Sequence, residues 1–182
     1  MQGYRERLTG GHPNSLGNTE EVVAEVLQQP AYFDELFECY FSDDEIVRMR
    51  TSNAMKRAAK AAPELVTPYL DRFIDEVAYI PQASAQWTVA QLMLALDKYL
   101  SEGQRASAKT LLKRPFERED TEPSDWRDDW IVLNMSMATL GHWAKRDAEL
   151  AAWFRPHLER LAGDRRKSVR GRAEKLLGVV GK

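Results

Sequence analysis

Residues 43–50, DDEIVRMR, have a counterpart near the other end of the chain in residues 164–172, DRRKSVRGR. In both segments an acidic residue precedes Val-Arg-x-Arg, and a run rich in Ala, Leu, Met or Lys follows. In the first copy, apolar and small residues recur at helical spacing on one stripe, which consists of Val47, Thr51, Ala54, Met55 and Ala58. A helix-forming segment that occurs twice predicts a chain built from internal repeats.

Two further copies lie between these segments. When the apolar stripes are aligned, the anchors are separated by 38, 47 and 37 residues, and they are Val47-Arg48, Ala85-Gln86, Val132-Leu133 and Val169-Arg170. The helix before the anchor also repeats, because VTPYLDRF at 66–73 matches FRPHLERL at 154–161 with its proline in register. A proline bends a helix or frees a carbonyl. Its recurrence at one offset indicates a unit of two helices.

With these features the sequence resembles HEAT-repeat proteins, in which the first helix of a unit often carries a proline and the second opens with Asp-x-x-Val-Arg. The resemblance covers residues 19–180, extends to small bacterial HEAT-like proteins, and is weakest in the third unit, where Leu133 replaces the arginine. It implies an all-α fold, a right-handed α-solenoid of about four HEAT-like helical pairs. It also implies that Arg48 and Arg170 form a ladder with nearby acids between adjacent repeats.

The domain boundaries follow from composition. Residues 1–17 contain glycine and proline with few apolar residues, which predicts a flexible N-terminal tail. A single repeat domain is expected over 18–182, beginning where Asn18 and Glu21 have the spacing of a capping box. The charged segment over 115–125 is expected to be a long loop within the third unit.

Charge and cysteine usage narrow the class of protein. The net charge is −2, so no overall basic field would recruit nucleic acid, and no apolar run approaches the roughly 20 residues of a membrane span. Cys39, the single cysteine, lies in an apolar stretch and is expected to be buried. The N-terminus has no apolar signal region, and we expect a cytoplasmic protein.

The two ends of the chain differ in charge. Between Asn18 and Arg48 there are nine acidic residues and one basic residue, whereas nine basic and three acidic residues follow from Arg155 to the end. Opposite charges on opposite ends predict a monomer, or a weak head-to-tail self-association that salt weakens.

The sequence gives little indication of catalysis. His12, His142 and His157 lack the partners that metal ligation needs at helical spacing, and no glycine-rich phosphate loop is present. The carboxylates over 117–129 alternate with arginines and are expected to be solvated. We therefore expect no enzymatic activity, no metal and no cofactor.

Four of the five tryptophans are expected in or over the core. Trp143 and Trp153 flank a helix junction and are predicted to be buried. Trp126 and Trp130 are four residues apart, which on one helix would point them in one direction. They are expected to cap the core beneath the long loop, or alternatively to form an exposed patch.

The candidate site is the concave face that stacked repeats create. Positions two and six residues after each anchor are predicted to point into it; they are Met49, Asn53, Trp87, Gln91 and Asn134. Two cations, Arg50 and Lys56, are expected at its edge, where they would select an acidic partner. We expect a non-enzymatic protein-binding or scaffold module whose partner is a protein or peptide. The alternative is a HEAT-like nucleic-acid-binding protein or an alkylpurine DNA glycosylase-like enzyme, which would need a basic track with aromatic residues around an acid.

Overall fold

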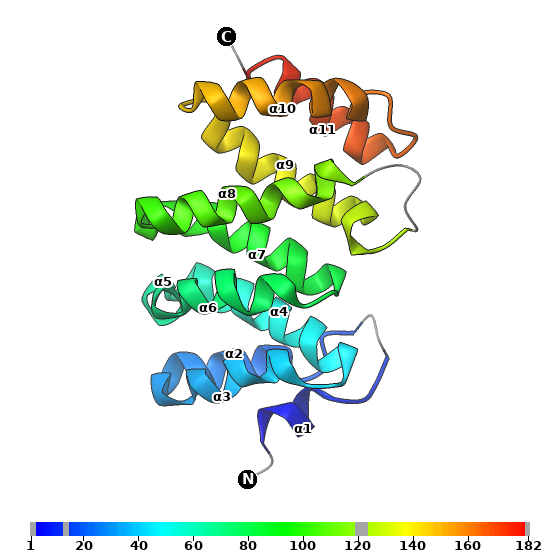
Figure 1. Cartoon of the computed structure of the whole chain (residues 1–182). Helices are drawn as coiled ribbons and strands as arrows, with labels where there is room; N and C mark the ends of the chain where they lie inside the picture. Colours follow the sequence, from blue (N-terminus) through cyan, green and yellow to red (C-terminus); the bar gives the residue numbers. More distant parts are fainter. Residues whose placement is uncertain (1–2, 13–14, 119–123, 181–182) are drawn as a thin grey trace.

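A computed structural model describes residues 3–12, 15–118 and 124–180. These residues form helices, turns and bends without a strand, as the periodicity predicted. The helices stack in order along the molecule, and the two termini lie at opposite ends of the stack (Figure 1). No helix in the described part of the chain is both long and apolar enough to cross a membrane.

The second helices of the four repeats form an inner row. They are α4 (Glu45–Ala61), α7 (Ala83–Ala95), α9 (Trp130–Ala144) and α11 (Lys167–Leu177), and each packs against the next. The anchors that open them, Val47, Ala85, Val132 and Val169, are all at most 1 % exposed. The predicted alignment of the repeats is thus confirmed at the position that defines it.

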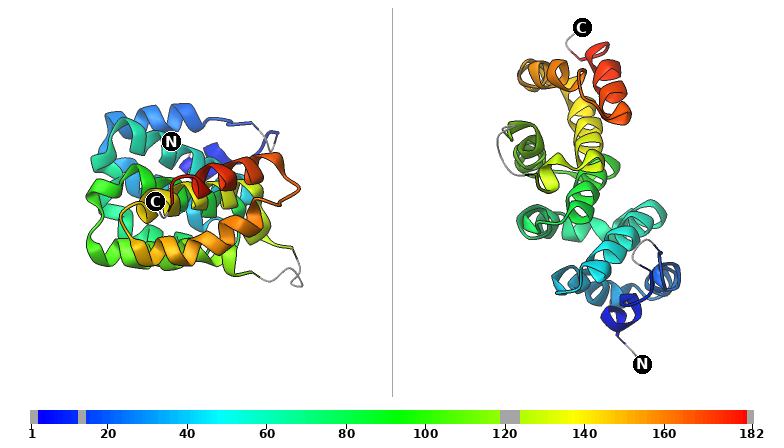
Figure 2. Two further views of the ribbon diagram at one scale, coloured as in Figure 1. Left: turned by 90° about the horizontal axis from the view of Figure 1, so that it is seen from above. Right: turned by 90° about the vertical axis from the view of Figure 1, so that its right-hand side faces the viewer.

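The first helices of the repeats form an outer row. They are α3 (Phe33–Glu38), the pair α5 (Pro63–Val66) and α6 (Leu70–Asp75), α8 (Glu102–Glu117) and α10 (Ala148–Leu161). Edge-to-face aromatic contacts join neighbouring members, with ring centroids 5.2 Å apart for Phe37 and Phe73 and 5.3 Å apart for Phe116 and Phe154. The second view of Figure 2 shows the two rows edge-on.

The repeated prolines act differently in the two helices that carry them. Pro68 lies in a short 3-10 turn, Thr67–Tyr69, which separates α5 from α6, whereas Pro156 lies inside an uninterrupted α10. The flanking apolar positions nevertheless correspond, since Val66 and Phe154 are both fully buried. The proline therefore marks the repeat without fixing the local helix geometry.

A shared hydrogen bond explains why the residue directly after the anchor is Arg or Gln in three of the four units. Arg48 donates to the Ser42 carbonyl (2.6 Å) and Arg170 to the Asp164 carbonyl (2.8 Å), each six residues earlier. Gln86 occupies the same position in the second unit and donates to the Ile80 carbonyl at 2.6 Å. This side chain thus satisfies a carbonyl at the turn between the two helices of a unit, a role that Leu133 cannot fill.

The ladder between repeats is present in a modified form. Arg48 Nε donates to Gln82 of the second unit at 2.5 Å, and Gln82 donates back to the Glu45 carbonyl. Between the third and fourth units the ion pair is made by Arg166 with Asp128, 3.1 Å apart, rather than by Arg170. The amide of Gln82 thus replaces an acid as the partner of Arg48.

The N-terminal segment differs from the predicted tail. Residues Tyr4–Leu8 form the short helix α1, and the side chains of Tyr4 and Leu8 are 3 % and 0 % exposed. Arg7 forms a two-point ion pair with Glu25, at 2.6 and 2.8 Å. Composition alone suggested a detached tail because its few apolar residues are widely spaced, yet those few are the ones that are buried. Residues 1, 2, 13 and 14 lie outside the described part.

The start of the repeat domain also needs correction. Helix α2 (Thr19–Gln28) begins without a side-chain cap from Asn18, so the predicted capping box is absent. Moreover, α2 packs chiefly on α4, in the manner of the preceding member of the inner row, instead of serving as the first half of unit one. It covers the face of α4 that would otherwise end the stack.

The predicted long loop begins later than expected. Helix α8 continues to Glu117, and a 3-10 turn, Trp126–Asp128, precedes α9. Residues 119–123 lie outside the described part of the chain. Asp129 then caps α9 by accepting from the Ile131 and Val132 amides at 2.8 and 3.1 Å.

Candidate functional site: the concave groove

Two adjoining hollows lie along the inner row of helices, and together we call them the groove. The central hollow has a volume of about 620 Å³ and is formed by α4, α7 and α9; its lining is Lys56, Ala59, Lys60, Gln91, Leu92, Leu94, Ala95 and Met135. The end hollow has a volume of about 350 Å³ between α9 and α11; its lining is Trp130, Asn134, Met135, Ser168, Gly171, Arg172 and Lys175. Met135 lines both, so the two hollows adjoin at this residue, and together they extend from α4 to α11.

Two of the predicted site residues, Lys56 and Trp87, meet at the α4–α7 contact. Lys56 and Trp87 are both half-buried, and the Lys56 ammonium lies 5.8 Å from the centre of the Trp87 ring, within the range of a cation–π contact. Burial lowers the pKa of Lys56, and the neighbouring Arg57 adds repulsion. Asn53, one turn earlier, donates to the Met49 carbonyl at 3.1 Å.

Gln91 lines the central hollow with Lys56, whereas Met49, Asn53 and Trp87 line neither hollow. Gln91 Nε2 lies 3.0 Å from the Met135 sulfur on α9, and Gln91 Oε1 is buried without a hydrogen-bond partner in the described residues. Met49, Asn53, Lys56, Trp87 and Gln91 are all partly exposed. Their placement on the inner row agrees with the predicted register, because positions two and six after an anchor face away from the outer helices.

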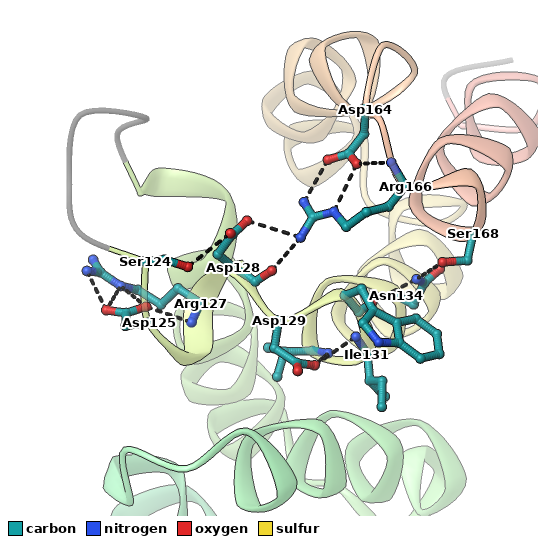
Figure 3. A network of polar contacts seen from close by, with 12 residues as sticks. Ser124, Asp125, Arg127, Asp128, Asp129, Ile131, Asn134, Asp164, Arg166 and Ser168 are labelled. Carbon is teal, nitrogen blue, oxygen red and sulfur yellow. Dashed lines mark hydrogen bonds and ion pairs between the residues drawn. The ribbon is translucent and has the colours of Figure 1, made fainter.

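Asn134 does not have the predicted exposure. Its side chain is 4 % exposed, donates to the Trp130 carbonyl at 2.7 Å and accepts from Arg172 Nε at 2.9 Å. It also lies 3.5 Å from the Ser168 hydroxyl, as Figure 3 shows. Helix α11 packs close enough here to cover the amide, so Asn134 positions Arg172 instead of presenting itself to a partner.

Arg50 was predicted at the edge of the site, and this assignment is wrong. Its side chain is 1 % exposed and faces the N-terminal segment. The guanidinium donates to the carbonyls of Leu8 (2.7 Å), Thr9 (3.1 Å), His12 (3.4 Å) and Ser15 (3.1 Å), and to the Ser15 hydroxyl (3.2 Å). Five hydrogen bonds compensate the burial of this charge. Arg50 is a structural residue.

The groove contains cations that the sequence-based prediction missed. Lys60 and Lys175 are exposed and Arg172 is partly exposed, and none of the three has a carboxylate partner in the described part of the chain. Neither hollow is lined by an acidic residue. The alignment alone would have found Arg172, because it occupies the same position in its repeat as Arg50.

Trp130 is also part of the groove, whereas Trp126 is not. Trp130 is 49 % exposed and lines the end hollow, while Trp126 packs under the Arg114 guanidinium, 5.1 Å from its ring centre. The two were predicted to face one way, but the extended backbone of Asp129 separates the 3-10 turn from α9, so helical spacing does not apply. Trp143 is in the core as predicted, and Trp153 is partly buried against Phe154.

Charged groups elsewhere are used in structural contacts. Arg166 links Asp164, 2.7 Å away, to Asp128, which holds the third and fourth units together (Figure 3). The Arg166 guanidinium lowers the pKa of Asp164. The described residues hold no cluster of three or more His, Cys, Asp or Glu side chains suited to a metal ion.

Cys39 is buried as expected. The side chain is 2 % exposed and its thiol donates to the Glu35 carbonyl at 3.4 Å. Burial raises the pKa of Cys39 to about 11. A thiol that stays protonated at neutral pH is a poor nucleophile.

The comparisons with known proteins concern the fold. No protein-family model matches the sequence, and no curated protein matches it either. An engineered protein solved by the Northeast Structural Genomics Consortium is similar in structure, with a TM-score of 0.62, 16 % identity and coverage of 98 % of this chain and 79 % of that one. A designed armadillo repeat protein gives a TM-score of 0.43 and 14 % identity over 97 % of this chain and 98 % of its own, which is too distant to support an argument. The chain is an all-α solenoid of stacked helical pairs, similar in fold to that engineered protein.

Proposed function

We propose that the protein is a non-enzymatic binding or scaffold module that holds a segment of another protein in the groove. The observation that carries this proposal is that two adjoining hollows extend across the four inner helices, with an apolar lining in the central one. Ala59, Leu92, Leu94, Ala95 and Met135 surround the central hollow, which is wide enough to receive an apolar side chain. A surface of this kind suits a peptide anchored by one or two side chains.

The composition of the groove favours a protein partner over the glycosylase alternative. A DNA glycosylase needs an acid among aromatic residues at the place where the flipped base is held. The residues that line both hollows include tryptophan and lysine or arginine but no Asp or Glu.

Site-specific photocrosslinking tests the proposal. A benzoylphenylalanine at Ala95 lies in the central hollow, and the same residue at Ala152 on α10 serves as a control on the outer row, where that position is equally exposed. We expect a discrete protein adduct in cells from Ala95 and none from Ala152. Equal adducts from both positions would contradict a groove-specific function. An adduct that disappears after nuclease treatment would favour the nucleic-acid alternative.

A further inference from the structure

The two arginines at matching positions in the first and last repeats suggest what the groove binds. Arg50 and Arg172 each lie three residues after the buried valine of their unit, Val47 or Val169. Arg50 is saturated by main-chain carbonyls of this same chain, those of Leu8 at the end of α1 and of Thr9, His12 and Ser15 after it. Arg172 uses only Nε, toward Asn134, and its two terminal nitrogens have no partner in the described residues. The arginine at position three in the repeat thus binds main-chain carbonyls at one end of the molecule, and at the other end its terminal nitrogens have no partner among the described residues.

The charges of the groove favour one class of partner. At one end Lys56 and Lys60 border the central hollow, and at the other Arg172 and Lys175 border the end hollow. The lining of both hollows contains no acid to neutralise them. Burial lowers the pKa of Lys56, which a neighbouring carboxylate would oppose. Electrostatic complementarity therefore requires negative charge on the molecule that occupies the groove.

We propose that the groove binds an extended acidic segment of a partner protein, with one apolar side chain in the central hollow and carboxylates at Lys56 and Lys60 and at Arg172 and Lys175. This rests on the proposed function and specifies its partner. Three helix-to-helix steps separate α4 from α11, which at about 8–10 Å each spans roughly 24–30 Å. An extended chain covers that distance with about 8 residues. Trp130, 49 % exposed beside Arg172, offers a flat apolar contact at the end of the path.

Binding of designed peptides tests the chemistry of the partner. The probe is a fluorescein-labelled peptide of about 12 residues, long enough to span the groove, with Asp and Glu at both ends, one central Leu and prolines that keep it extended. Its matched control carries Lys at every acidic position. By fluorescence anisotropy we expect the acidic peptide to bind at least about tenfold more tightly, and the difference to shrink as salt is raised. Replacing the central Leu by Ser is expected to weaken binding by about tenfold.

Paired charge reversals test where on the protein the acidic peptide binds. The variants Lys56→Glu with Lys60→Glu, and Arg172→Glu with Lys175→Glu, should each reduce affinity for the acidic peptide by about tenfold or more. The control Lys98→Glu with Lys145→Glu makes the same change in net charge at exposed positions away from both hollows, and should change affinity by less than about twofold. If a half-buried reversal prevents folding, the exposed pair Lys60→Glu with Lys175→Glu carries the same expectation.

Several results would overturn the proposal. Equal affinity for the acidic and the lysine peptide would remove the charge selectivity. Tighter binding of a single-stranded oligothymidylate, lost in the same variants, would assign the groove to nucleic acid. Self-association of the protein that is abolished by the same charge reversals would make the occupant a second copy of this chain. A protein adduct from Ala95 without peptide binding would leave the proposed function intact and refute only the acidic partner.

Discussion

The first and last repeats contain the same Val-Arg-x-Arg segment, yet the second arginine has opposite roles in the two. Arg50 is 1 % exposed and closes the N-terminal segment onto α4, whereas Arg172 is partly exposed and borders the groove. The local backbone is helical in both, and the first arginine of each makes the same hydrogen bond to a carbonyl six residues earlier. The difference therefore arises from what covers each end of the stack. An identical motif can be core in one repeat and surface in another.

The largest difference in stability should appear between two single variants, Arg50→Ala and Arg172→Ala. Arg50→Ala leaves four carbonyls without their donor and a buried gap, so we expect a loss of about 3 kcal/mol in the free energy of unfolding. For a chain of this size that corresponds to a fall in Tm of about 6–12 °C. Arg172→Ala should cost less than about 1 kcal/mol, because its side chain is accessible to water. Denaturant unfolding of both variants measures the comparison, and equal losses would contradict it.

A pair of glycines tests the same contrast through the backbone. Gly17 has φ +51°, and a Cβ there would lie 2.8 Å from Arg50 Cζ, so Gly17→Ala should destabilise the protein by about 2 kcal/mol. Gly171 lies inside α11 with open space around its Cβ position, and Gly171→Ala should stabilise by about 0.5–1 kcal/mol. Thermal melts should shift in opposite directions. A neutral Gly17→Ala would mean that the N-terminal segment is not fixed by Arg50.

A smaller difference in stability should appear at acidic pH, between variants of Asp164 and of its counterpart Ser42. Asp164 and Ser42 are matching residues, and each accepts a hydrogen bond from the amide two residues later, but only Asp164 is ionised and paired with Arg166. The lowered pKa of Asp164 means that its stabilisation is present above the unfolded pKa of about 3.9 and is lost as pH falls through the folded value. Asp164→Asn should therefore cost about 1 kcal/mol at neutral pH and progressively less as the pH falls below about 3.9.

The matched control is Ser42→Ala, whose effect should persist at pH values where Asp164→Asn becomes neutral, because a hydroxyl does not titrate there. Denaturant midpoints at neutral and acidic pH measure both variants. If the cost of Asp164→Asn is the same at both pH values, the ion pair with Arg166 contributes nothing.

The smallest effect concerns the charge of the two ends. The acidic first unit and the basic last unit are expected to attract each other weakly between molecules, giving open head-to-tail oligomers at low ionic strength. At physiological salt, charges are screened beyond about 8 Å, and the protein should then be monomeric. Sedimentation velocity at low and at physiological salt measures this difference. A dimer that persists at both would require an apolar interface instead.

Much of the fold could be predicted from the sequence because it depends on local periodicity. The stripe Val47, Thr51, Ala54, Met55 and Ala58 is fully buried, and so is the matching stripe Ala85, Val89, Leu92 and Met93. A helix with one apolar face must bury it against a neighbour, so a repeated face gives stacked helices. The row Met49, Trp87 and Gln91 was placed on the inner face by the same reasoning.

The sequence alone determined that this protein is a stack of helical pairs, and which side of each helix is buried within its own pair. Only the tertiary structure decided what each remaining side faces. Arg50 and Asn134 are buried because α1 and its following segment cover one and α11 covers the other. Trp130 is exposed because Asp129 ends the preceding turn before α9 begins. Helical periodicity is a property of neighbouring residues, whereas the burial of an outward position depends on chain segments far away in the sequence.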